Sequence, residues 1–141
     1  MARVKNVAGY DYVILDVVRG QWSAHEREKI IKQTAQMDGY NCEVWVEQEP
    51  GSGGKESAEN TIRNLAGYMV KKEPVTGDKT LRAEPLSDQV NIGNVRLLKG
   101  PWNQKFIDEL QNFPVGKYKD QVDAAGGAFN KIAAQKRAGA W

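Results

Sequence analysis

The side chains best suited to chemistry are three carboxylates, Glu47, Asp120 and Asp123. Glu47 closes a predicted strand over residues 43–47, and strand ends of this kind line the sites of α/β proteins. Asp120 and Asp123 are spaced i, i+3 near the start of the last predicted helix, so they share one helix face. Each carboxylate also has a simpler explanation. Glu47 can be a solvated residue at a strand end, and the helix dipole favours Asp120 and Asp123 near a helix N-terminus. Together they have the arrangement of a two-metal nuclease site, in which carboxylates hold two Mg²⁺ or Mn²⁺ ions about 4 Å apart.

Two other groups of residues suggest chemistry that their patterns do not support. Nothing in the sequence brings Cys42 and His25 together as a nucleophilic pair, and His25 is expected to be solvated in a first helical turn. Residues 51–55 (GSGGK) suggest a phosphate loop. However, Glu49 stands where that motif needs its first glycine, and Glu56 stands where it needs Ser or Thr. The run is therefore predicted to be a flexible strand-to-helix turn, with binding of a DNA phosphate as the minor alternative.

Length, composition and charge indicate one ordinary domain. A chain of 141 residues with 40% apolar residues is large enough to bury a core without disulfides. Twenty basic against 18 acidic residues give a net charge of +2, which is too balanced to indicate nucleic-acid binding by itself. No apolar run approaches the roughly 20 residues of a membrane span, and no secretion signal is recognisable. With a single cysteine, these features favour a cytoplasmic location.

Hydrophobic periodicity predicts alternating strands and helices. Ser23 and Glu26 form a capping box at the start of the first helix. The predicted strands are residues 10–18, 43–47, 68–72 and 95–98, and the predicted helices are 24–38, 55–66, 103–113 and 118–135, with one or two helical turns within 78–84. This order is typical of an α/β fold with at least one parallel strand pair. No linker divides the chain, so a single domain over residues 1–141 is expected.

Five segments resemble the C-terminal nuclease domain of phage terminase large subunits. They are LDVVRGQWS (15–23), VEQEPGSGGK (46–55), GDKTLRAEP (77–85), GNVRLLKGPWNQKFIDELQNFP (93–114) and GKYKDQVDA (116–124). The resemblance covers most of the chain and implies an α/β, RNase H-like mixed sheet flanked by helices. It also implies a metal-dependent endonuclease that cuts concatemeric viral DNA during packaging. No ATPase domain is expected, because no phosphate loop is found.

The resemblance assigns catalytic and metal-binding roles to the carboxylates. Glu47 matches the family's strand glutamate before the glycine-rich turn, and Asp120 matches the acidic pair of the closing motif, with Asp123 one turn further on. All three are the implied ligands of Mg²⁺ or Mn²⁺ ions, which polarise the scissile phosphate and activate water.

The resemblance also implies DNA contacts and partners. Lys79 and Arg82 match basic positions of the family and suit contacts to phosphates. With them, Lys55 and Lys117 complete the candidate DNA-binding residues. The implied partners are double-stranded DNA, the portal or procapsid and the small terminase subunit, and no membrane contact is expected. The implied setting is the bacterial host of a phage or prophage.

Two departures from the family pattern affect these expectations. The family carries an aspartate on an opening central strand, and no segment matches it, because neither Asp11 nor Asp16 lies in that motif. The first central strand and the first metal ligand are therefore expected to be missing. The closing motif often reads His-Asp-Asp, whereas here Tyr118 and Lys119 precede Asp120, and a lysine beside the site opposes a dication. The expected endonuclease is therefore impaired or inactive.

Two alternatives remain open at this stage. A catalytically dead DNA-binding or packaging-assembly module would use the four basic residues to hold DNA or a partner, with structural carboxylates. An RNase H-like resolvase acting on branched DNA would use the same acids as the terminase nuclease. In either case, the neighbours of a missing central strand would expose unpaired backbone edges, so self-association is expected.

Overall fold

A computed structural model describes residues 1–138, which form two compact units. Unit 1 comprises Met1–Arg19 and the described chain from Gly77 onward, and unit 2 is Gly20–Thr76. Both units contain helices and strands, which alternate along unit 2, and the sheet of unit 1 contains both parallel and antiparallel neighbours. The predicted α/β class with a mixed sheet is therefore confirmed.

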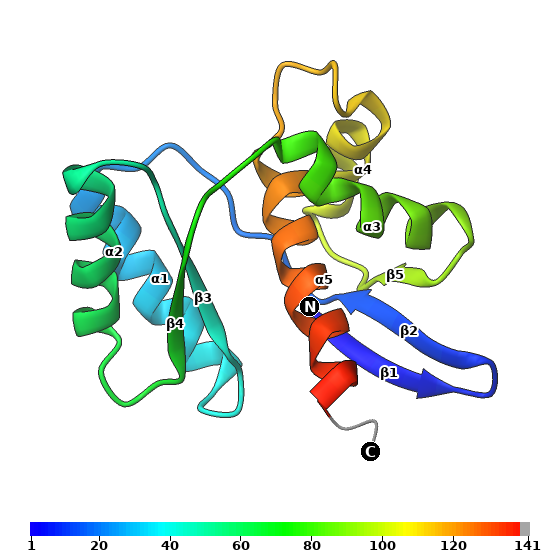
Figure 1. The fold of residues 1–141 in the computed structure, drawn as a ribbon, viewed down its shortest axis with the longest axis horizontal. Coiled ribbons are helices and arrows are strands. Elements are labelled where there is room, and N and C mark those ends of the chain that lie inside the picture. The colour runs from blue at the N-terminus through cyan, green and yellow to red at the C-terminus, as the bar shows by residue number, and fades with distance from the viewer. Residues whose placement is uncertain (139–141) are drawn as a thin grey trace. The chain divides into compact units, whose positions relative to one another are not determined.

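The sheet of unit 1 has three strands in the order β1-β2-β5 (Figure 1). Strand β1 (Ala2–Asn6) forms an antiparallel hairpin with β2 (Gly9–Ile14), and β5 (Val95–Leu97) lies parallel to β2. Strand β1 was not predicted, because its sequence ARVKN contains only one strongly strand-favouring residue, Val4. The strand predicted over residues 10–18 begins one residue earlier and ends at Ile14.

Three helices complete unit 1: α3 (Lys79–Asn91), α4 (Asn103–Asn112) and α5 (Asp120–Ala138). Helix α5 packs against both α3 and α4. The core joins β2 to all three helices through six buried side chains: Tyr12, Ile14, Leu86, Phe106, Ala125 and Phe129. The rings of Tyr12 and Phe129 meet edge to face, with centroids 4.7 Å apart.

Helix α3 is much longer than the one or two turns predicted within residues 78–84. The Asp78 carboxylate accepts a hydrogen bond from the backbone N–H of Thr80 (2.7 Å) and caps the helix. Pro85 lies inside the helix and argues against it at the sequence level. Burial of Ala83 and Leu86 stabilises the helix despite Pro85, so tertiary packing outweighs local propensity here.

Unit 2 contains α1 (Ala24–Asp38), β3 (Val44–Gln48), α2 (Ser52–Asn64) and β4 (Val70–Pro74). Strands β3 and β4 form a two-stranded parallel sheet. Helix α2 packs against both strands, and α1 packs against α2. Along β3, Val44 and Val46 are half-buried while Trp45 and Glu47 are exposed, as the predicted alternation requires.

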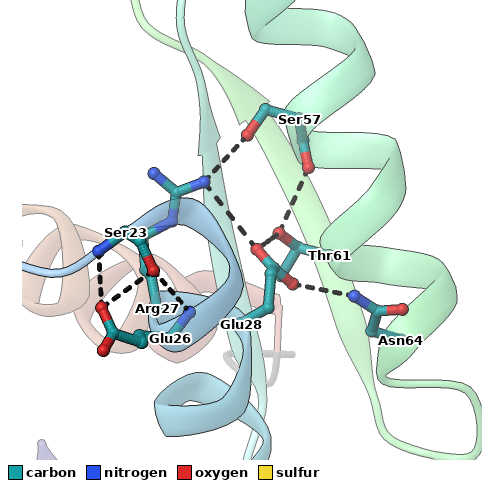
Figure 2. Close-up of polar contacts among 7 residues, drawn as sticks. All are labelled: Ser23, Glu26, Arg27, Glu28, Ser57, Thr61 and Asn64. Carbon is teal, nitrogen blue, oxygen red and sulfur yellow. Dashed lines mark hydrogen bonds and ion pairs between the residues drawn. The ribbon is translucent and has the colours of Figure 1, made fainter.

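Polar contacts cap the N-terminus of α1 and link α1 to α2 (Figure 2). The predicted capping box is confirmed, since Glu26 N–H donates to Ser23 Oγ (3.3 Å) and Ser23 N–H donates to the Glu26 carboxylate (2.9 Å). The Glu28 carboxylate accepts hydrogen bonds from Thr61 Oγ1 (2.7 Å) and Asn64 Nδ2 (3.1 Å) of α2. Glu28 therefore holds the two helices of unit 2 in register.

Candidate functional site

Asp123 is the buried member of the predicted carboxylate pair. Only 5% of its side chain is exposed. Its Oδ1 accepts a hydrogen bond from Arg82 Nη2 at 2.5 Å, and its Oδ2 lies 3.2 Å from Lys79 Nζ. Both cations come from α3, so this carboxylate fastens α3 to the first turn of α5. A charge buried to this extent needs such partners to offset its desolvation.

The close approach of α3 and α5 brings Arg82 to Asp123. A Cβ atom added at Gly126 would lie 3.2 Å from Ala83 Cα and 3.4 Å from the Arg82 carbonyl oxygen. That carbonyl also accepts a hydrogen bond from Asn130 Nδ2 (3.0 Å) on α5. Glycine at position 126 and alanine at position 83 therefore let the two backbones approach, which sets the ion pair beside them.

Asp120 is the first residue of α5 and is exposed to solvent. The first turn of α5 is capped from α4 by Glu109, a buried residue whose carboxylate accepts hydrogen bonds from Val122 N–H (2.9 Å) and Gln121 Nε2 (2.7 Å). Sequence reasoning did not find Glu109. The available signal was its spacing of three residues from Phe106, which puts a carboxylate on the apolar face of α4.

Glu47 lies on β3 in unit 2, on the exposed face of the strand. In the parallel ladder it is the register partner of Glu73 on β4. Glu73 is a second carboxylate that the sequence did not reveal, because strand register is a non-local property. Two carboxylates in directly opposed positions repel each other unless a cation compensates their charge.

The three predicted metal ligands thus belong to both units. Asp120 and Asp123 share the first turn of α5, as their spacing predicted, whereas Glu47 belongs to unit 2. Among residues 1–138, no group of three His, Cys, Asp or Glu side chains is arranged to hold a metal ion. Because both oxygens of Asp123 contact cations, Asp120 and Asp123 alone do not fit a two-metal site.

The four predicted DNA-binding cations differ in their surroundings. Lys79 and Arg82 contact the Asp123 carboxylate. Lys55 lies in the first turn of α2 with its Nζ 4.0 Å from a Glu59 oxygen, which is a weak, exposed pair. Lys117 precedes α5, and its Nζ lies 5.3 Å from the centroid of the neighbouring Tyr118 ring.

The glycine-rich run is not a flexible turn throughout, because α2 already begins at Ser52. Gly51, the residue before the helix, has a φ of +92° that favours glycine. A Cβ atom at Gly54 would lie 2.0 Å from the Glu49 carbonyl oxygen. The backbone conformation at Gly51 and the close contact at Gly54 therefore favour glycine at both positions, and the helix predicted from residue 55 begins three residues earlier.

Cys42 and His25 lie at opposite ends of α1, with His25 in its first turn and Cys42 beyond its C-terminus. A helix of 15 residues is roughly 22 Å long, so the two side chains do not form a nucleophilic pair. Burial raises the pKa of the Cys42 thiol, and nearby Asp38 adds to this effect. A thiol of this kind is a poor nucleophile at neutral pH.

Over residues 1–138, no helix is both long enough and apolar enough to cross a membrane.

Comparison with known proteins identifies the family. Searches of the curated proteins and of the solved structures found no match. The family model of the terminase RNaseH-like domain matches residues 5–132, from β1 into α5 and across both units. Because this match covers most of the 141 residues, the chain belongs to the terminase RNase H-like domain family.

Proposed function

We propose that this domain is a metal-dependent endonuclease that cuts concatemeric viral DNA for packaging by a terminase. The observation that carries the proposal is the family match over residues 5–132. In this role its partners are double-stranded DNA, the portal or procapsid and the small terminase subunit of a phage or prophage. The proposed cofactor is Mg²⁺ or Mn²⁺, which polarises a phosphate and lowers the pKa of bound water.

Asp120 is the proposed principal ligand of unit 1. Its carboxylate is exposed at the start of α5 and has no ion pair among the described residues. Glu47 is the proposed ligand of unit 2. Both Asp123 oxygens already contact Lys79 and Arg82, so its main proposed role is to join α3 to α5. As a metal ligand, Asp123 would have to share these oxygens between the metal ion and the two cations.

A second candidate function is a DNA-binding or packaging-assembly module without cleavage. The observation that favours it is the ion pair of Asp123, which neutralises one of the predicted ligands. In such a module the carboxylates are structural and the basic residues contact DNA or a protein.

Cleavage and binding measured on the same DNA separate the two functions. Supercoiled plasmid is incubated with the protein in Mg²⁺, in Mn²⁺ and in EDTA, and binding of a labelled duplex is followed in parallel. The endonuclease predicts nicked or linear plasmid with either metal and intact plasmid in EDTA. Binding without cleavage by folded protein supports the second function. Preferential cutting of a four-way junction would indicate a resolvase.

A further inference from the structure

A groove in unit 1 combines positive charge with an exposed aromatic ring. Its volume is about 360 Å³, and it lies between Arg19, helix α4 and the segment that leads into α5. Six of its lining residues matter for ligand binding: Arg19, Lys105, Asp108, Glu109, Lys117 and Tyr118. Of these, only Lys117 was recognised from the sequence.

The three basic side chains of the groove are exposed and available to a ligand. Arg19, Lys105 and Lys117 form no ion pair with a carboxylate in the part of the chain that the structure describes. Lys79 and Arg82 differ, because Asp123 contacts both of them. An incoming phosphate therefore meets less competition in the groove than at α3.

Tyr118 positions two of these cations. Tyr118 is 51% exposed. The Arg19 Cζ lies 5.5 Å and the Lys117 Nζ lies 5.3 Å from the ring centroid, within the range of cation–π attraction. The ring thus holds a guanidinium and an ammonium group from separate segments of unit 1 beside one groove.

The two carboxylates of the groove are already engaged. Both oxygens of Glu109 accept hydrogen bonds from α5, at Val122 N–H and Gln121 Nε2. Asp108 Oδ1 accepts a hydrogen bond from Gln104 Nε2 at 2.8 Å. Three cations against two carboxylates leave the lining with a formal charge of +1, which favours an anionic ligand.

We propose that this groove binds the phosphodiester backbone of DNA. Arg19 and Lys105 are new contact residues, and Tyr118 is a positioning residue that orients Arg19 and Lys117. Tyr118 and Lys117 come just before Asp120 in sequence, so the groove would hold a strand next to the proposed ligand on α5. The inference rests on the proposed function, because it gives a DNA-cutting domain its contact to substrate.

Charge substitutions in the full chain test the groove directly. Affinity for a labelled duplex is measured by fluorescence anisotropy for R19Q, K105Q and K117Q. The matched control is K5Q, which removes one charge at an exposed position of β1 outside the groove. Each groove variant is expected to bind about three- to tenfold more weakly and to reduce the slope of log K against log salt by about 0.9. K5Q is expected to change affinity less than about twofold.

Tyr118 variants separate positioning from general charge. Y118F keeps the ring and is expected to bind DNA like the parent, whereas Y118A is expected to weaken binding as much as K117Q does. Circular dichroism confirms that each variant is folded. The proposal is overturned if the groove variants bind like K5Q, if Y118A binds like the parent, or if the folded parent does not bind duplex DNA.

The same variants distinguish failure of the groove from failure of the nuclease. Loss of affinity in R19Q and K105Q together with no cleavage by the parent would sustain the groove and contradict the endonuclease. Metal-dependent cleavage with unaltered DNA affinity in the groove variants would contradict the groove and leave the endonuclease in place.

Discussion

At the scale of single residues, Asp123 shows how a neighbouring helix changes the role of a carboxylate. Its spacing from Asp120 suggests a pair of metal ligands. In the fold, however, Asp120 is exposed while Asp123 is 5% exposed and contacts Lys79 and Arg82. The two acids on one helix face therefore have different roles, because Asp123 forms ion pairs with α3 whereas Asp120 is exposed to solvent.

Substituting Asp123→Asn tests the structural task. The amide removes the negative charge that Lys79 and Arg82 contact, so the free energy of unfolding of unit 1 is expected to fall by about 1–3 kcal/mol. This is less than the loss for a fully buried pair, because Lys79 and Arg82 are 46% and 25% exposed and water screens them. Urea denaturation gives the value. Asp88→Asn, on the exposed side of α3, should change stability by less than about 0.5 kcal/mol. Equal stability of both variants would contradict the structural role.

The capping box of α1 predicts a pH effect. Hydrogen bonds from the backbone and hydroxyl of Ser23 lower the pKa of Glu26 from its usual value of 4.5. The lowered pKa means that the contribution of the box is present above pH 4.5 and is lost as pH falls through the folded pKa. In Ser23→Ala the pKa of Glu26 should rise, as an NMR titration would measure. An unchanged pKa would show that the Ser23 hydroxyl does not contribute to holding this carboxylate, because the backbone N–H of residue 23 remains in the variant.

At the scale of elements, local signals predicted well and non-local ones did not. The start of α1 was predictable because Ser23 and Glu26 are three residues apart and bond to each other. Helix α3 was underestimated, because its stability comes from burying Ala83 and Leu86 rather than from its own sequence around Pro85. For the same reason the sequence indicated that Asp120 and Asp123 share a face but not that α3 supplies cations to Asp123.

Matched glycine substitutions test the packing of α3 against α5. Gly53→Ala in α2 places its Cβ in open space, so it is expected to stabilise the protein by about 0.5–1 kcal/mol through helix propensity. Gly126→Ala places its Cβ 3.2 Å from Ala83, so the helices must separate by a few tenths of an ångström and the gain is expected to vanish or reverse. Urea denaturation compares the two. A gain at Gly126 equal to that at Gly53 would contradict close packing at this position.

At the scale of the whole molecule, the sheets have edges that favour self-association. Within residues 1–138, strands β3 and β4 each have one neighbouring strand, and β1 and β5 are the edges of the other sheet. Unpaired strand edges can bind another chain. The fraction of dimer or larger species is expected to rise with protein concentration in sedimentation-velocity measurements. A single monomeric species over a hundredfold range of concentration would refute this expectation.

The family match spans both units, so the proposed nuclease is a property of the whole chain. Cleavage requires more of the molecule than DNA binding does, since it needs Asp120 and a divalent ion in addition to the contacts that hold DNA. Losing cleavage while keeping affinity is therefore the signature of a ligand residue, and losing both would indicate misfolding or a DNA-contact residue.

The most direct measurement is the rate of duplex cleavage against Mn²⁺ concentration for the parent and for Asp120→Asn, with DNA affinity recorded for both. Asp88→Asn serves as the control for removal of one carboxylate charge. The parent and Asp88→Asn are expected to cut at a rate that saturates with Mn²⁺, while Asp120→Asn binds DNA equally well and does not cut at any Mn²⁺ concentration. Equal cutting by Asp120→Asn, or no cutting by a folded, DNA-bound parent, would contradict the proposed endonuclease.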